Sequence, residues 1–211
     1  MLEKKLDIYK VIWLFVLGCL FGYLLETVFY VIKYGYFVNK QGLIIGPFKP
    51  IYGTGMVMVS LLFSKLNIND KWKIFLIGTI LGTVFEYLCS YLLEVIWGFY
   101  IWDYSSFDYN INGRIYLPYC LVWGLISVGW YSYLYPLFLK IYHKLNLNKI
   151  KIVTLLFGIF MFFDISLTFL VYFRMKDSDN NCKVYQIVDK MFPKEEVKSK
   201  FSKVRKIKTR N

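Results

Sequence analysis

Apolar blocks of about 20 residues or more, separated by short polar stretches, constrain this chain more than any other feature. A helix needs roughly 20 apolar residues to cross the ~30 Å hydrocarbon core of a bilayer, and the blocks have that length. Inside lipid every backbone N–H and C=O must be bonded within the protein, which makes helices the default. We therefore predict an all-α, polytopic bundle of transmembrane helices. The five expected spans cover residues 11–32, 43–63, 74–97, 115–139 and 152–173.

The charge of the chain is concentrated at its C-terminal end. The net charge is +12, and 12 of the 26 Lys and Arg residues lie in residues 174–210. A basic segment that follows a last membrane span more often lies near anionic headgroups than on nucleic acid. The sequence thus predicts a transmembrane domain over residues 1–173 and a basic tail over residues 174–211, with the lipid bilayer and not nucleic acid as partner.

The second expected span is interrupted near its start. Pro47 and Pro50 lie three residues apart, remove two backbone donors and restrict the residues before them. The stretch is either an interfacial loop before a short helix or a broken, re-entrant segment that packs against protein. The second alternative is favoured, because residues 51–63 alone are too short to span.

Residues suited to metal or nucleophilic chemistry are sparse. The four cysteines are Cys19, Cys89, Cys120 and Cys182, and no two of them have the spacing of a zinc or redox motif. The single histidine is His143. We expect no metal site, no cofactor and no catalytic residue, and an enzyme is the less favoured class.

The first 140 residues contain a pattern that occurs twice. Gly18, Gly22 and Glu26 are spaced four apart, and Gly78, Gly82 and Glu86 repeat this spacing 60 positions later. In the loops that follow, Gly42, Pro47 and Gly53 correspond to Gly113, Pro118 and Gly124, 71 positions later, and Tyr52 corresponds to Trp123. A competing register would align Tyr23-Leu-Leu-Glu26 with Tyr91-Leu-Leu-Glu94.

The first register leaves the helices ungapped and predicts two repeats of two spans each, over about residues 11–64 and 72–139. Both repeats would enter the membrane in the same direction, which implies a pseudo-two-fold axis along the membrane normal. The fifth span, residues 152–173, stands outside the repeats.

Two glutamates are the first candidates for a substrate or ion pathway. A carboxylate at membrane depth costs on the order of 2.5–3.5 kcal/mol and persists mainly where it faces a bundle interior or a cavity. Glu26 and Glu86 each share a helix stripe with two glycines, and small residues on a stripe allow helices to approach closely. Both are expected at a helix interface, where paired carboxylates suit proton binding or cation coordination. A structural role, with the carboxyl bonded to a backbone group or a tyrosine, is equally open.

Two further acidic residues belong to the same candidate set. Glu94 lies near the end of its expected span, where it can snorkel, so the structural role is favoured for it. Asp164 lies in the middle of the fifth span. It is expected to bond either Ser166 or another helix, or else to partner a basic side chain.

The loop between the third and fourth spans is a second candidate site. It carries Trp102, Asp103, Tyr104, Asn112, Gly113 and Arg114. Trp and Tyr suit the headgroup level, so an interfacial anchor is the simple interpretation. Asp103 and Arg114 could also pair across the loop, and Arg114 could bind an anionic group bidentately. The matching loop of the first repeat, residues 39–42, likewise has a cation, Lys40, and a glycine.

Together these motifs resemble a known family. The chain is similar to the bacterial polytopic membrane proteins known as ABC-transporter permeases of the CmpB type, over about residues 11–173 and more weakly over residues 185–204. The family typically has Arg before the loop glycine, where this chain has Lys40-Gln41. The motifs that carry the resemblance are Glu26, Gly46-Pro47, Pro50-Ile51-Tyr52-Gly53, Glu86-Tyr87, Ser90, Trp102-Asp103-Tyr104-Ser105, Asn112-Gly113-Arg114 and Trp123-Gly124.

Three functions stay open at this point. The first is a transporter permease-like subunit in a bacterial cytoplasmic membrane, which would act with a separate ATPase subunit or an ion gradient and would form a homodimer. The chain lacks a Gly-x4-Gly-Lys-Ser/Thr loop, so it would not bind ATP in that manner. The second is a non-catalytic membrane partner or assembly protein. The third, and least favoured, is a membrane-embedded enzyme that acts on lipid-linked substrates.

Overall fold

The computed structural model describes residues 7–39, 41–100, 102–145, 147–176, 183–193, 195, 197 and 205–206. Lys40 and Cys182, and the remainder of the basic tail, lie outside the described residues. The described chain is mostly helical, as the sequence predicts. Its helices are α1 (Ile8–Tyr34), α2 (Pro50–Leu66), α3 (Lys71–Trp97), α4 (Leu117–Gly129), α5 (Tyr135–Lys144), α6 (Leu147–Lys176) and α7 (Lys183–Met191), with a π-helical turn, η1 (Trp130–Leu134), between α4 and α5.

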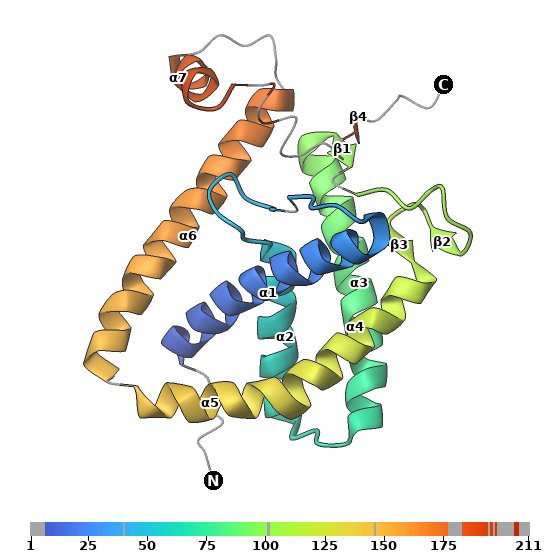
Figure 1. Ribbon diagram of the computed structural model, residues 1–211, viewed down its shortest axis with the longest axis vertical. Coiled ribbons are helices and arrows are strands. Elements are labelled where there is room, and N and C mark those ends of the chain that lie inside the picture. Colours follow the sequence, from blue (N-terminus) through green and yellow to red (C-terminus); the bar gives the residue numbers. More distant parts are fainter. Residues whose placement is uncertain are drawn as a thin grey trace.

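Four two-residue strands complete the secondary structure. β1 (Phe99–Tyr100) pairs antiparallel with β4 (Arg205–Lys206), and β2 (Asn110–Ile111) pairs antiparallel with β3 (Ile115–Tyr116). The second pair forms a small hairpin that leads directly into α4 (Figure 1).

Within the described residues, three helices are long and apolar enough to cross a membrane, namely Ile8–Tyr34, Lys71–Ile96 and Ile150–Met175. They coincide with the first, third and fifth expected spans. Asp7 and Asp70 begin α1 and α3 as side-chain caps, accepting from Lys10 N at 2.8 Å and from Lys73 N at 3.0 Å. Gly35 and Gly98 end the same two helices in the left-handed conformation.

The two other expected spans differ from a single long helix. α2 begins only at Pro50 and has 17 residues, because proline suits the first turn of a helix but not its interior. The fourth expected span is interrupted by the π-helical turn η1, in which the amide of Tyr135 donates to Trp130 O five residues back. The next residue, Pro136, has no amide hydrogen to donate. Their crossing of a membrane, and the total of five spans, stay predictions.

The 42–49 segment, which precedes α2, packs against protein. Leu43, Ile44 and Phe48 are all less than 10% exposed. Its backbone is bonded within the chain, since Gly42 N donates to Phe48 O at 2.8 Å and Lys49 N donates to Cys19 O at 3.1 Å. The irregular backbone of this segment is therefore largely covered by protein, and its re-entry into a membrane stays a prediction.

The main core lies where α1, α2, α3 and the α4–α5 region meet. It includes Leu14, Phe63, Ile74 and Trp130, and the Trp130 indole donates to Ser60 Oγ at 2.8 Å. In Figure 1, α1 crosses α2 near the centre, α3 and α4 lie together on the right, and α6 leans away on the left. α6 is tied back to α1 by Trp13 Nε1, which donates to Thr154 Oγ1 at 2.7 Å.

Candidate functional site

Two helix pairs approach closely at their glycines. A side chain at Gly18 would meet the backbone of Gly53, and one at Gly22 would overlap the ring of Tyr52. α1 and α2 therefore pack almost backbone to backbone. In the same way, a side chain at Gly78 would meet Ser127 beside Gly124, and one at Gly82 would overlap the indole of Trp123, so α3 and α4 pack equally closely.

Glu26 follows these glycines on α1 and is neutralised by a lysine. Its carboxylate forms an ion pair with Lys49 at the start of α2, and the two side chains are 26% and 15% exposed. The Lys49 ammonium also lies 5.9 Å from the centre of the Tyr52 ring, and the Tyr52 hydroxyl lies within electrostatic range of Glu26. One carboxylate, one ammonium and one aromatic ring thus form a compact group at the end of the α1–α2 contact.

Glu86 follows the glycines on α3 and has different partners. It is 6% exposed and accepts hydrogen bonds from Trp123 Nε1 at 2.8 Å and from the Tyr104 hydroxyl at 3.2 Å. Both donors are neutral. Among the residues that the structure describes, no Lys or Arg forms an ion pair with Glu86.

The partners of the two glutamates touch each other. The rings of Tyr52 and Trp123 lie 5.4 Å apart between centres at an angle of 33°. A continuous path of contacts therefore runs from Glu26 through Tyr52 and Trp123 to Glu86. We call these residues, with the two outer partners, the central cluster; it comprises Glu26, Lys49, Tyr52, Glu86, Tyr104 and Trp123.

Tyr104 comes to the central cluster from the loop before β2. Burial raises the pKa of its hydroxyl well above the usual range, and the nearby carboxylates of Glu86 and Glu26 raise this pKa further. The hydroxyl therefore keeps its proton and acts as a donor to Glu86. Both glutamates lie close enough to raise the pKa of the same phenol.

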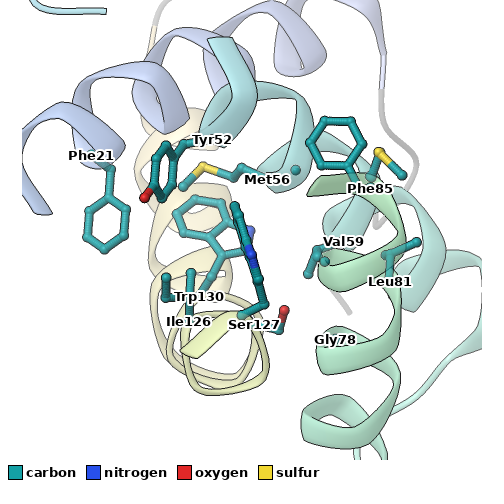
Figure 2. A pocket seen from close by; sticks show the side chains of 14 residues that line it. Phe21, Tyr52, Met56, Val59, Gly78, Leu81, Phe85, Ile126, Ser127 and Trp130 are labelled. Atoms are coloured by element: carbon teal, nitrogen blue, oxygen red, sulfur yellow. The ribbon is translucent and has the colours of Figure 1, made fainter. Parts of the chain in front are cut away.

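A small apolar cavity of about 30 Å³ adjoins the cluster. Tyr52, Trp123 and Gly82 line it together with Phe85, so two residues of the central cluster form part of its wall. Figure 2 shows Tyr52 and Met56 on one side of this space and Leu81 and Phe85 on the other. The volume is about that of a water-sized site, and its lining is aromatic and apolar.

The 102–114 loop is organised differently from the expected Asp103–Arg114 pair. Arg114 forms an ion pair with Glu94, and its guanidinium lies over the rings of Tyr87 and Tyr91 at 5.7 and 5.4 Å. Asp103 instead accepts from Ser105 N at 2.9 Å, as a local turn. The possible Asp103–Arg114 pair does not form in the structure, because Asp103 bonds within the loop and Arg114 pairs with Glu94 of α3.

The other loop residues hold this arrangement. Trp102 Nε1 donates to Arg114 O at 3.0 Å, and Asn112 Nδ2 donates to the Tyr87 hydroxyl at 3.0 Å. Gly113 has a φ of 65°, and a side chain there would overlap Ser105 and Asp103. Because the loop is folded back in this way, Tyr104 N donates to Gly113 O at 2.8 Å and the Tyr104 ring can reach Glu86.

Asp164 stands apart from the central cluster. It is fully buried in α6 and accepts from Ile45 N at 3.0 Å, while Thr168 Oγ1 one turn later accepts from Ile44 N at 3.0 Å. Ser166 donates to Phe162 O instead, and among the described residues no Lys or Arg forms an ion pair with Asp164. Asp164 therefore anchors the 42–49 segment, which carries Lys49 towards Glu26.

Sequence reasoning found the two glutamates and missed most of their partners. Glu94 and Asp164 lie outside the central cluster, as do Trp102, Asp103, Asn112, Gly113 and Arg114, whereas Tyr104 lies in it. Lys49 is a partner that the sequence pattern does not predict, although a lysine between two prolines in an apolar stretch is a usable signal. Gly46 and Pro47 shape the segment, and Gly46 has a φ of 79°.

The long apolar helices and a buried, charged centre between them define a multi-pass helical membrane protein. The chain belongs to the family described as Putative ABC-transporter type IV, whose model matches residues 13–169. This is the CmpB-type family that the sequence motifs resemble. Neither a curated protein nor a solved structure matches the chain.

Proposed function

We propose that the chain is the permease subunit of a transporter and that the central cluster lies on its pathway for a cation, either a proton or a small ammonium ion. The family name supports a transport component. Glu86 lies on α3, one of the helices that can cross a membrane. A carboxylate at that position is costly and is retained mainly where it has a function.

The difference between the two glutamates carries this proposal. Glu26 has the ammonium of Lys49 as its counter-ion, held over the ring of Tyr52. Glu86 has two neutral donors, which orient the carboxylate but leave its charge uncompensated. Lys49 therefore illustrates the kind of group that Glu86 can take, a positive charge between a carboxylate and aromatic faces.

In this proposal the chain contains an internal duplication and crosses the membrane five times. The close contacts of Gly22 with Tyr52 and of Gly82 with Trp123 support the register with offsets of 60 and 71, since each pair occupies the same place in its half. A pseudo-two-fold axis along the membrane normal would then pass between the touching rings of Tyr52 and Trp123. The pathway would follow that axis, between two halves that need not be identical.

Energy would come from a separate ATPase subunit or from an ion gradient. The 211 residues contain no Gly-x4-Gly-Lys-Ser/Thr loop, so the chain would rely on another subunit for nucleotide binding. A homodimer would give a larger assembly around two pathways. The cell membrane of a bacterium remains the proposed location.

The test combines co-purification with a flux assay. The tagged chain is purified in mild detergent, its co-eluting proteins are identified, and the sample is reconstituted into vesicles that report uptake of protons and of methylammonium. Glu86→Gln is compared with Glu195→Gln, which alters an exposed glutamate of the tail. We expect Glu86→Gln to lower uptake by about tenfold or more, since a charge-assisted contact of 1.5–3 kcal/mol corresponds to a factor of ten to a hundred.

Uptake that is equal in the two variants would contradict the pathway. If neither uptake nor an ATPase partner is observed with the native chain, the assembly-protein hypothesis takes the place of the permease.

A further inference from the structure

α7 exposes apolar side chains along one stripe. Val184, Ile187 and Met191 are 53%, 60% and 63% exposed, and their spacing of three and four residues places them on one face of the helix. Scattered apolar residues on a surface are normal, but a continuous stripe on a nine-residue helix needs a partner.

The direction of this stripe is fixed by Val188. Val188 shares the face with Ile187 and Met191, and it is 5% exposed because it packs against Val171 and Tyr172 of α6. Val188 therefore fixes one edge of the apolar face against the last turns of α6, and the exposed stripe lies beside that contact. The part of α6 that is long and apolar enough to cross a membrane ends at Met175, so α7 would lie at the level where that helix leaves the membrane.

A charged contact holds α7 across the end of α6. Arg174 donates to both carboxylate oxygens of Asp189, from Nε at 3.3 and 3.0 Å and from Nη2 at 2.8 Å. Its guanidinium also lies 5.3 Å from the centre of the Tyr185 ring. Figure 1 shows α7 as a short helix set at an angle to the end of α6. The bidentate geometry fixes the orientation of the helix as well as its position.

The charges on α7 indicate which surface it meets. Lys183 and Lys190 are exposed, and in a helical projection they lie on one flank of the apolar stripe, opposite the flank that carries Tyr185 and Asp189. Lysine side chains beside an apolar stripe can reach anionic headgroups while the stripe meets the acyl boundary. The sequence after α7 adds eight Lys and Arg residues between positions 194 and 210.

We propose that α7 is an interfacial helix whose apolar stripe enters the headgroup–acyl boundary of an anionic bilayer. A protein partner would have to bind the stripe at the same level, in competition with the lipid that surrounds α6. An anionic bilayer suits both the apolar stripe and the lysines beside it. The same bilayer would surround α6, which lies next to α7.

The experiment places a polarity-sensitive fluorophore on a single cysteine in the full chain, after the four native cysteines are replaced by serine. Ile187→Cys reports from the stripe, and Gln186→Cys reports from the opposite face as a matched control. Both proteins are reconstituted into nanodiscs of phosphatidylcholine, with or without phosphatidylglycerol, and with lipids brominated near the headgroup. We expect quenching at position 187 to exceed that at 186 by about twofold or more, and phosphatidylglycerol to increase the difference.

A third sample, Ile187→Cys with Asp189→Asn, weakens the contact with Arg174 and is expected to reduce the quenching without abolishing folding. Equal quenching at positions 186 and 187 would overturn the proposal. Quenching that is strong at 187 but unaffected by phosphatidylglycerol would overturn its anionic part. Emission at 187 that shifts to the blue without any quenching by brominated lipid would identify a protein surface as the occupant, and would also overturn it.

Discussion

The α1–α2 half and the α3–α4 half of the protein have the same close packing but different charge balance. In each half a glycine stripe meets an aromatic residue of the next helix, Tyr52 in one and Trp123 in the other. In the first half the glutamate beyond the glycines has a lysine partner, and in the second it has only neutral donors. The glycines account for the close packing that both halves share. Packing does not account for the different partners of Glu26 and Glu86, and we propose that transport does.

The largest effect is expected from filling the glycine contacts. Gly22→Ala and Gly82→Ala would each place a Cβ atom into an aromatic ring, so we expect each to lower the free energy of unfolding by about 1–3 kcal/mol. Gly129→Ala is the control, because a Cβ atom there meets no atom within 4 Å. Thermal unfolding in detergent measures all three. A Gly82→Ala variant as stable as Gly129→Ala would show that the two halves do not pack alike.

The second prediction concerns the counter-ion of Glu26. Lys49→Met leaves a mostly buried carboxylate without its ammonium, and we expect a loss of about 1–2 kcal/mol, reduced from the fully buried case because both side chains are partly exposed. The double variant Glu26→Gln with Lys49→Met should recover most of this loss. A double-mutant cycle on unfolding measures the coupling, and additive effects would contradict the pairing.

The third prediction compares the aromatic donors of the two halves. Trp123→Phe keeps a ring against Tyr52 but removes the donor to Glu86, and we expect a loss of about 1 kcal/mol. Tyr52→Phe removes the hydroxyl near Glu26 and should cost less, because the ion pair of Glu26 with Lys49 remains. Chemical denaturation of the two variants tests the order, and a larger loss for Tyr52→Phe would reverse the assignment of charge balance.

The smallest effect is a change in stability at high pH. The pKa of Tyr104 is raised in the folded state, so the unfolded chain loses the phenol proton first as the pH rises above about 10. The contribution of Tyr104 is therefore fully present below that pH and declines above it. Tyr104→Phe should flatten this part of the stability–pH profile. An unchanged slope between native and variant protein would show that Tyr104 ionises as freely in the fold as outside it.

The apolar blocks predicted five spans, and three of these coincide with long apolar helices of the described chain, because a span depends on length and composition, which one sequence contains. They could not fix the start of α2 or the position of η1, which depend on where the chain around Pro50 and Pro136 packs. Pro47 and Pro50 indicated the interruption before α2, whereas the π-helical turn η1 was not predicted; Trp130 in that turn donates to Ser60 of α2.

The site was predictable in its acidic residues and not in their partners. Glu26 and Glu86 follow glycine stripes, and helical spacing alone places them at a helix contact. Their partners depend on how two loops fold. Tyr104 reaches Glu86 only because the loop turns back at Gly113, and Lys49 reaches Glu26 only because Asp164 and Thr168 anchor the segment before it.

The most direct test of the account is the thermal stability of the purified protein in the presence of cations. Methylammonium, sodium and potassium are titrated against the native chain, Glu86→Gln and Glu26→Gln at constant ionic strength and at several pH values. If Glu86 binds a cation, then methylammonium, sodium, potassium or a proton should stabilise the native chain by about 1–3 kcal/mol near saturation. The same stabilisation should be present in Glu26→Gln and absent in Glu86→Gln. Stabilisation that is equal in native protein and Glu86→Gln, or absent from every titration of the native chain, would contradict it.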